Sequence, residues 1–149
     1  MTLPVIAIVG YSDTGKTTVA SSLIQTLVAR GYRIAAVKHC AHGHEIDRPS
    51  TDSARLFAAG AGRVVMSSPD LLTSIEATQV DTPLETIVAS LDSSDYIYDL
   101  VVAEGFKGSS VPKVMVMGEE RLSPSPQNII AVVDDHKTAG TVPSYTFRE

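Results

Sequence analysis

The chain is poor in several features that particular protein classes require. Its single cysteine, Cys40, rules out an internal disulfide and agrees with a reducing compartment. It has no tryptophan and only 5% aromatic residues, so it offers few rings on which single-stranded nucleic acid would stack. Its net charge is -5 and it has no run of basic residues, whereas nucleic-acid phosphates favour clustered Lys and Arg. We therefore expect no nucleic-acid partner.

Long apolar runs are also absent. No stretch approaches the roughly 18 apolar residues that a membrane-spanning helix needs. Residues 1–4 contain no basic segment, and the apolar stretch that follows ends at Gly10, which argues against a secretory signal. The sequence has no internal repeat and no interdomain linker. We expect a cytoplasmic globular protein with no membrane partner, a single domain over residues 1–149, and a loosely packed tail after about residue 134.

Hydrophobic periodicity predicts strands that alternate with helices. The expected strands are residues 5–9, 34–37 and 63–66 and the runs "YDLVVAEG", "PKVMVMG" and "NIIAVVDD", and the expected helices are residues 16–30, 51–59 and 83–91. Such alternation is typical of right-handed βαβ units. The sequence therefore predicts an α/β fold with a mostly parallel sheet and helices on both faces.

Three local details follow from the same patterns. In the second helix, Leu56 and Phe57 are expected to face inward, and Thr82 is expected to cap the third helix. The strand-like runs around "EGFKGSSVPKVMVM" are too close together for a helix between them. We therefore expect an antiparallel pair or a local excursion there.

The segment "GYSDTGKT", Gly10–Thr17, matches the phosphate-binding pattern G-x-x-x-x-G-K-[ST] at every fixed position. In such a loop, backbone N–H groups surround the β-phosphate, Lys16 reaches the β and γ oxygens, and the Thr17 hydroxyl ligates Mg²⁺. The side chain of Asp13 is expected to turn outward, away from phosphate. The pattern predicts a P-loop NTPase whose nucleotide-binding residues are Gly10, Tyr11, Ser12, Asp13, Thr14, Gly15, Lys16, Thr17 and Thr18.

A phosphate loop needs a carboxylate at the end of a neighbouring strand, because Mg²⁺ prefers hard oxygen ligands. "DLVVAEG" supplies Glu104, which is either that ligand or a solvated strand end, whereas Asp99 at the other end of the run is expected to be solvated. Asp52 is either the cap of the second helix or an outer ligand that completes a metal site with Thr17 and Glu104. Lys16 and Glu104 are the candidate catalytic residues.

Histidines gather after the second strand. His39, Cys40, His42 and His44 lie within six residues, directly after Lys38. A structural zinc site would need a second ligand pair, yet the one other histidine is His136. We favour a loop that meets a substrate or a partner over a metal site.

These segments together resemble the MobB family of molybdenum-cofactor biosynthesis. The resemblance rests on "GYSDTGKTT", "VKH" with further histidines, "DS.R...AGA", and "EGFK" followed by "PK", in the same order from Gly10 to Lys113. It implies a dimeric protein that binds GTP with Mg²⁺ and is at most a slow GTPase. It also implies an adapter or donor that acts with a MobA-like guanylyltransferase, which attaches GMP to molybdopterin, with molybdopterin or a molybdoenzyme as further partners.

The resemblance also suggests roles for single residues outside the phosphate loop. It places a switch-like function on His39, Asp47, Asp52 and Arg55. The full set of residues expected to form a loop that meets substrate or partner is Lys38, His39, His44, Asp47, Arg55 and Lys107. No NKxD segment is present to read guanine, so the choice of GTP over ATP rests on the resemblance.

Two other functions remain open from the residues alone. An ATP-dependent small-molecule kinase or ligase of the dethiobiotin-synthetase kind has a similar phosphate loop and a similar "EG" strand end. The histidines also suggest a GTPase for nickel insertion.

Overall fold

A computed structural model describes residues 3–41, 43, 51–118, 123–135 and 141–147 of the chain. The chain forms two compact units. The larger, here called the sheet unit, comprises Met1–His39 and Pro83–Glu149, and the smaller, the hairpin unit, comprises Cys40–Thr82. Within the described ranges, no helix is long and apolar enough to cross a membrane.

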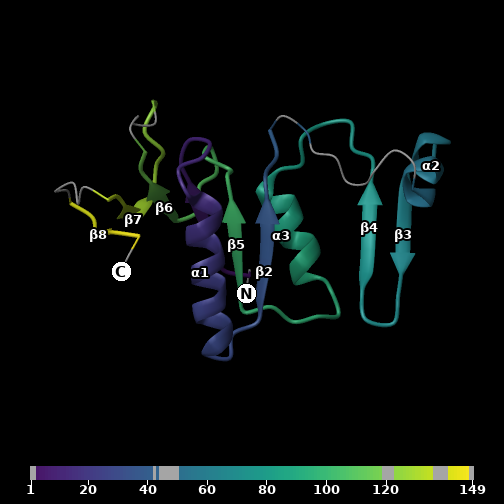
Figure 1. Ribbon diagram of the computed structural model, residues 1–149, viewed down its shortest axis with the longest axis horizontal. Coiled ribbons are helices and arrows are strands. Elements are labelled where there is room, and N and C mark those ends of the chain that lie inside the picture. The colour runs from purple at the N-terminus through teal and green to yellow at the C-terminus, as the bar shows by residue number, and fades with distance from the viewer. Residues whose placement is uncertain (1–2, 42, 44–50, 119–122, 136–140, 148–149) are drawn as a thin grey trace. The chain divides into compact units, whose positions relative to one another are not determined.

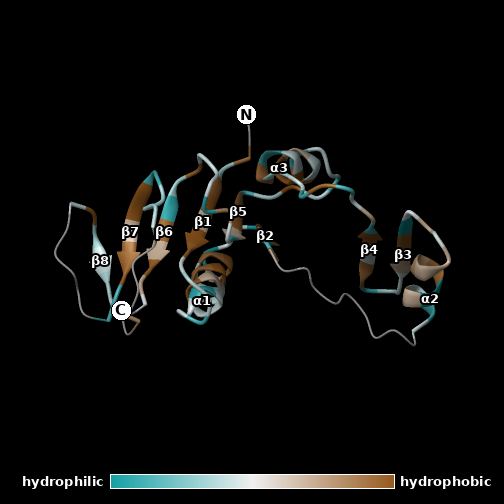
Figure 2. Ribbon diagram, turned by 90° about the horizontal axis from the view of Figure 1, so that it is seen from above, coloured by the Kyte–Doolittle hydropathy of each residue, from teal (hydrophilic) through white to brown (hydrophobic). Residues whose placement is uncertain are grey.

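The sheet unit contains six strands and two helices (Figure 1). They are β1 (Val5–Val9), α1 (Lys16–Ala29), β2 (Ile34–Lys38), α3 (Leu84–Asp92), β5 (Leu100–Glu104), β6 (Lys113–Val116), β7 (Ile129–Val133) and β8 (Ser144–Tyr145). The strand order is β2-β5-β1-β6-β7-β8, and every neighbouring pair is parallel. Figure 2 shows α1 and α3 on opposite faces of the sheet. The predicted α/β fold is therefore confirmed.

The core follows from the apolar run of β1. Successive side chains of a strand point to opposite faces, and β1 is apolar at every position, so it can be buried on both. Ile8 packs in a cluster with Ala20 of α1, whereas Ala7 and Val9 pack in a cluster with Leu84 of α3. The central strand thus joins both helices to one sheet.

Of the two alternatives expected around "EGFKGSSVPKVMVM", the antiparallel pair is wrong, and the chain makes a local excursion between two parallel strands. Both β5 and β6 run parallel to β1, one on each side of it. Ala7 pairs with Ala103 on one side and with Lys113 on the other, so β6 begins level with the end of β5. Because the chain needs to return by only a short distance, the segment Gly105–Pro112 makes a parallel connection without a crossover helix.

The hairpin unit contains α2 (Asp52–Ala58), β3 (Arg63–Ser67) and β4 (Leu72–Glu76). β3 and β4 pair antiparallel, from Arg63 opposite Glu76 to Ser67 opposite Leu72. The predicted strand 63–66 is therefore present, but it belongs to a separate two-stranded sheet. β4 was not predicted, because "LTSIE" has no long apolar run, although the turn residues "SSPD" precede it.

Three local predictions about the helix faces and caps are wrong. Leu56 is 59% exposed and does not face inward, whereas Phe57 is half-buried as predicted, and the one buried residue of α2 is Ser53. The cap of α2 is Thr51 rather than Asp52, because the Thr51 side chain accepts from the N–H of Ala54. α3 begins at Pro83 without a side-chain cap, so Thr82 does not fill that role.

The tail after residue 134 contributes an edge strand that the sequence did not predict. β8 pairs in parallel with β7, with Val133 opposite Tyr145. The N–H of Asp134 donates to the carbonyl of Tyr145 at 2.8 Å. A two-residue strand is too short to leave a recognisable pattern, but its pairing brings the described end of the chain to the sheet.

Lys113 is a fully buried cation at the start of β6. Its Nζ donates to the carbonyl oxygens of Ser109, Val111 and Gln127 at 2.5, 3.0 and 3.1 Å. Burial lowers the pKa of this amine below its ordinary value. All three acceptors are backbone groups, so Lys113 ties the segment before β6 to the segment before β7.

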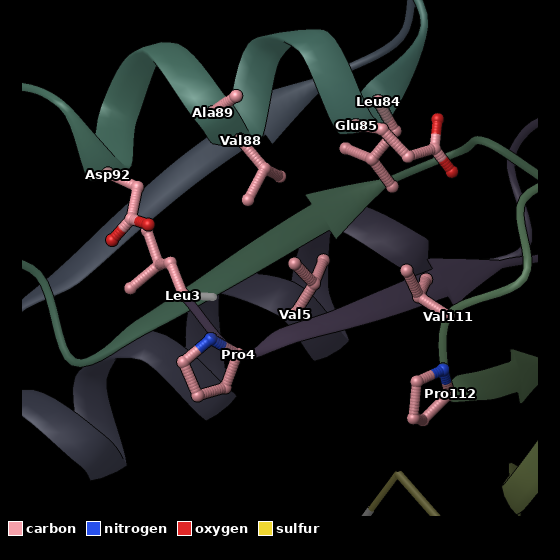
Figure 3. A pocket seen from close by; sticks show the side chains of 10 residues that line it. All are labelled: Leu3, Pro4, Val5, Leu84, Glu85, Val88, Ala89, Asp92, Val111 and Pro112. Carbon is pink, nitrogen blue, oxygen red and sulfur yellow. The ribbon is translucent and has the colours of Figure 1, made fainter. Parts of the chain in front are cut away.

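An open apolar groove of about 410 Å³ runs along α3 (Figure 3). Its lining comes from α3, from the start of β1 and from the residues before β6, namely Leu3, Pro4, Val5, Leu84, Glu85, Val88, Ala89, Asp92, Val111 and Pro112. Figure 3 shows Val88 pointing toward Val5, with Glu85 and Asp92 at the two ends. None of these residues belongs to the predicted nucleotide site.

An ion pair between Arg33 and Asp99, just before the starts of β2 and β5, predicts how the stability of the fold depends on pH. Asp99, expected to be solvated, accepts from the backbone N–H and from the guanidinium of Arg33, with Nη2 at 2.7 Å. These bonds lower the pKa of Asp99 to about 2 from 3.8. A carboxyl with a lowered folded pKa stabilises the fold above its unfolded pKa, so this contribution should disappear as the pH falls from about 4 toward 2.

Urea unfolding of wild type and Asp99→Asn between pH 5 and pH 2 measures this effect. We expect the variant to lose less stability with acid than wild type, and Arg33→Gln to match it because it removes the other partner. If the free energy of unfolding fell equally with pH in all three proteins, the ion pair would not be the cause of the acid sensitivity.

Candidate functional site

The carboxyl edge of the parallel sheet collects the residues predicted to act together. In a parallel sheet every strand ends at the same edge, and ligands of open α/β sheets bind there. This edge carries the loop after β1, Lys38 and His39 at the end of β2, and Glu104 at the end of β5. The topology therefore brings together residues that lie far apart in the sequence.

The phosphate loop has the backbone geometry of a tight turn that ends in a helix. Asp13 has φ 60° and Gly15 has φ 89°, both in the left-handed region, which Asp tolerates and Gly adopts without strain. Gly15 is the N-cap of α1, and no side chain caps that helix. The exposed Asp13 agrees with the expectation that its side chain turns outward. The uncapped N-terminus leaves amide donors available for an anion.

Close packing fixes the shape of this loop. A methyl group at Gly10 would lie 2.5 Å from the carbonyl oxygen of Val116 and 2.8 Å from Oγ1 of Thr14. A methyl group at Gly118 would lie 2.8 Å from Cγ2 of the same threonine. Thr14 thus sits between two glycines, and its hydroxyl donates to the carbonyl of Tyr11 at 3.0 Å. Gly118 was not predicted, although "VMVMG" repeats the strand-then-glycine pattern that identified Gly10.

Lys16 folds toward its own loop, where its Nζ donates to the carbonyl oxygen of Tyr11. The ammonium therefore lies against the loop backbone and not in free solvent. A cation beside the loop backbone is one part of the arrangement that attracts a phosphate chain.

Glu104 points toward the phosphate loop. Its Oε2 accepts from the hydroxyl of Thr17 at 2.8 Å, and its Oε1 lies 3.2 Å from Nζ of Lys38. The Glu104 side chain is only 13% exposed, whereas that of Lys38 is 58% exposed. The structure thus brings Thr17 and Glu104 together as predicted, and it excludes the interpretation of Glu104 as a solvated strand end. Two hard oxygen ligands side by side fit Mg²⁺.

The "EGFK" segment packs around the end of β2. Gly105 and Phe106 have φ 95° and 55°, and the Phe106 ring lies 5.0 Å from the His39 ring between centroids. A methyl group at Gly105 would lie 3.0 Å from Cβ of His39. Lys107 reaches back so that its Nζ lies 5.0 Å from the centre of the Tyr11 ring. His39 and Lys107 are therefore both at the site, His39 as a packing partner.

Four other predicted residues are not brought to this edge by anything described. His44 and Asp47 lie outside the described residues, as does His42. Asp52 and Arg55 belong to the hairpin unit, where Arg55 Nη1 lies 3.6 Å from Asp52 Oδ1 on the surface of α2. A metal role for Asp52 stays a prediction. Among the described residues, no three His, Cys, Asp or Glu side chains gather into a group that would hold a metal.

Phe147 is a site residue that the sequence analysis did not identify. A methyl group at Gly15 would lie 2.7 Å from Cε1 and 2.8 Å from Cζ of this ring. The contact joins residues at opposite ends of the chain, and only the pairing of β8 makes it possible. One available signal was an aromatic residue shortly after a strand-like pair, in "SYTF".

Comparison with known proteins identifies the relatives of this chain. The family described as MobB, molybdopterin guanine dinucleotide synthesis protein B, matches residues 5–135. A molybdopterin-guanine dinucleotide biosynthesis adapter protein of Haemophilus influenzae is 32% identical over 125 residues, which cover 84% of this chain and 69% of that protein. The protein of the same description from Escherichia coli is 32% identical over 139 residues, or 92% of this chain and 77% of that protein.

Solved structures agree with the fold. A crystal structure of molybdopterin-guanine biosynthesis protein B matches with a TM-score of 0.74 at 29% identity, covering 97% of this chain and 91% of the other. A MobB homologue from Bacillus stearothermophilus matches with a TM-score of 0.72 at 23% identity, covering 97% and 88%. The arrangement of strands and helices is thus shared.

The packing at Gly10 predicts a large effect of one methyl group. We expect Gly10→Ala to lower the free energy of unfolding by about 1–3 kcal/mol, because the methyl would overlap a backbone carbonyl that has little freedom to move. Gly108→Ala is the matched control, since no atom lies within 4 Å of its added methyl, and it should change stability by less than about 0.5 kcal/mol. Urea denaturation measures both, and equal midpoints for the two variants would contradict the described packing.

Proposed function

This chain belongs to the MobB family, and we propose that it is a GTP-binding adapter in the synthesis of molybdopterin guanine dinucleotide. The observation that carries the nucleotide part is the hydrogen bond from Thr17 to Glu104, next to a phosphate loop whose lysine lies within it. The adapter part is supported by the family and by the descriptions of the relatives from Haemophilus influenzae and Escherichia coli.

The proposed roles follow from the chemistry of the loop. The uncapped amides at the start of α1 and the ammonium of Lys16 bind the phosphates. Thr17 and Glu104 hold Mg²⁺, with Asp52 as a further candidate ligand. The ion, when bound, neutralises charge between the β- and γ-phosphates. Four to six charge-assisted hydrogen bonds of roughly 1.5–3 kcal/mol each are enough for micromolar binding after the cost of association.

The contacts of Glu104 support the proposal that hydrolysis is slow at most. Both of its oxygens already face donors, Thr17 on one side and Lys38 on the other. A carboxylate that already accepts from a hydroxyl and pairs with a lysine is poorly placed to take a proton from water. We therefore propose that Lys16 and Glu104 serve binding first, and that turnover is not the main task of the site.

Partner and assembly remain part of the proposal. We propose a MobA-like guanylyltransferase as the partner, with guanine preferred over adenine, a homodimeric state and a cytoplasmic location. The exposed Lys38 and Lys107 are the described members of the predicted partner loop that lie at the site. Direct contact with molybdopterin or a molybdoenzyme belongs to the same proposal.

Calorimetry with GTP and Mg²⁺ tests the nucleotide site. We expect Lys16→Ala to weaken GTP binding roughly 10- to 100-fold, because it removes charge-assisted hydrogen bonds to phosphate. Arg30→Ala, which removes an exposed cation just beyond the other end of α1, is the control and should bind as wild type does. Glu104→Gln should retain the partner of Thr17 yet lose most of the dependence of binding on Mg²⁺. Unchanged affinity in Lys16→Ala would remove the nucleotide proposal.

The adapter role is tested with a purified guanylyltransferase of the MobA type. We expect the two proteins to co-elute, and we expect the chain to raise the rate at which GMP is attached to molybdopterin. Lys16→Ala should co-elute but give a smaller increase, because docking and nucleotide binding use different residues. A wild-type chain that neither co-elutes nor changes the rate would contradict this role.

A further inference from the structure

The end of the chain places an aromatic ring on the phosphate loop. β8 is fixed to β7 by two paired residues and by the bond from the Asp134 N–H to Tyr145. Because β8 is parallel to the other strands, Thr146 and Phe147 leave it at the carboxyl edge, where the phosphate loop also lies. The position of Phe147 is therefore set by the sheet and not by an unattached tail.

The ring lies where a side chain at Gly15 would be. Its Cε1 and Cζ atoms would lie within 2.8 Å of a methyl group at that glycine, so the ring is in direct contact with the loop backbone. It is nevertheless 41% exposed. A large apolar ring that touches the loop and keeps much of its surface open has a face available for a ligand.

The order of strands places charged side chains on one side of the phosphate loop and an aromatic ring on the other. Glu104 and Lys38 end β5 and β2, on one side of β1, whereas Phe147 follows β8 on the other side. In the proposed site, the terminal phosphates of the nucleotide carry most of its charge and bind near Lys16, Thr17 and Glu104. With the terminal phosphates at those residues, the nucleoside end of the ligand has room to extend toward the side of strands β6 to β8, where the ring of Phe147 contacts the loop.

We infer that Phe147 supplies a stacking face for the purine of the nucleotide bound at the phosphate loop, an inference that rests on the proposed nucleotide site. Every purine has a π-face, so stacking adds affinity without selecting guanine over adenine. Phe147 therefore strengthens binding of GTP and ATP alike and contributes nothing to binding of inorganic triphosphate. Selection of guanine falls to other residues.

A single tryptophan tests the contact directly. Because the chain contains no tryptophan, Phe147→Trp introduces one fluorophore at this position. We expect GTP with Mg²⁺ to quench its emission, and we expect inorganic triphosphate with Mg²⁺ to leave it nearly unchanged. Tyr32→Trp is the matched control, since this exposed residue lies just beyond the far end of α1, and it should respond to neither ligand.

Truncation of the ring gives the energetic test. Phe147→Ala should bind GTP and ATP more weakly than wild type by a similar factor, roughly 5- to 100-fold. It should bind inorganic triphosphate with the same affinity as wild type. Phe147→Tyr should retain the affinity for GTP, because it keeps the π-face. Thermal unfolding of each variant without ligand shows whether the fold is intact.

Three outcomes would overturn the inference while the proposed nucleotide site stands. Tighter binding of both GTP and triphosphate by Phe147→Ala would mean that the ring obstructs the loop. Equal loss for GTP and triphosphate would mean that it only supports the loop backbone, and equal GTP binding by wild type and Phe147→Ala would mean that it touches no ligand. If wild type binds neither GTP nor triphosphate, the proposed nucleotide site itself fails, and the inference fails with it.

Discussion

The hydrogen bonding of β1, in parallel with β5 on one side and β6 on the other, determines which side chains meet at the carboxyl edge. Glu104 reaches Thr17 because β5 ends beside β1. The carbonyl oxygen of Val116 lies close to Gly10 because β6 ends on the other side of β1. An antiparallel neighbour in either position would turn one of these strand ends to the opposite edge. The site therefore depends on the direction of strands that contribute few of its atoms.

The sequence predicted the parts of the structure whose cause is local. An apolar run, two glycines and an amphipathic segment specify β1, the phosphate loop and α1 within consecutive residues, and "DLVVAE" carries its own acidic end. The direction of β6 could not be predicted, because it depends on a register offset that no residue pattern encodes. The contact of Phe147 with Gly15 joins the two ends of the chain through a two-residue strand, and the missed β4 has a mixed composition.

The chain passes from the sheet unit into the hairpin unit directly after the candidate site residues Lys38 and His39. Lys38 faces Glu104 and His39 packs on Phe106, and the next residue, Cys40, already belongs to the inserted unit. The chain therefore enters the hairpin unit directly after two residues that contact the end of β5 and the segment that follows it.

Lys113 has a consequence for chemical labelling of the protein. Reagents that acylate amines need a lysine that is both uncharged and within reach, and Lys113 is fully enclosed by carbonyl oxygens even though burial favours its uncharged form. Exposed lysines such as Lys38 react regardless of local openings. Modification of Lys113 therefore requires the backbone at Ser109, Val111 or Gln127 to move away from its amine, so the rate of its acylation measures local opening around the start of β6.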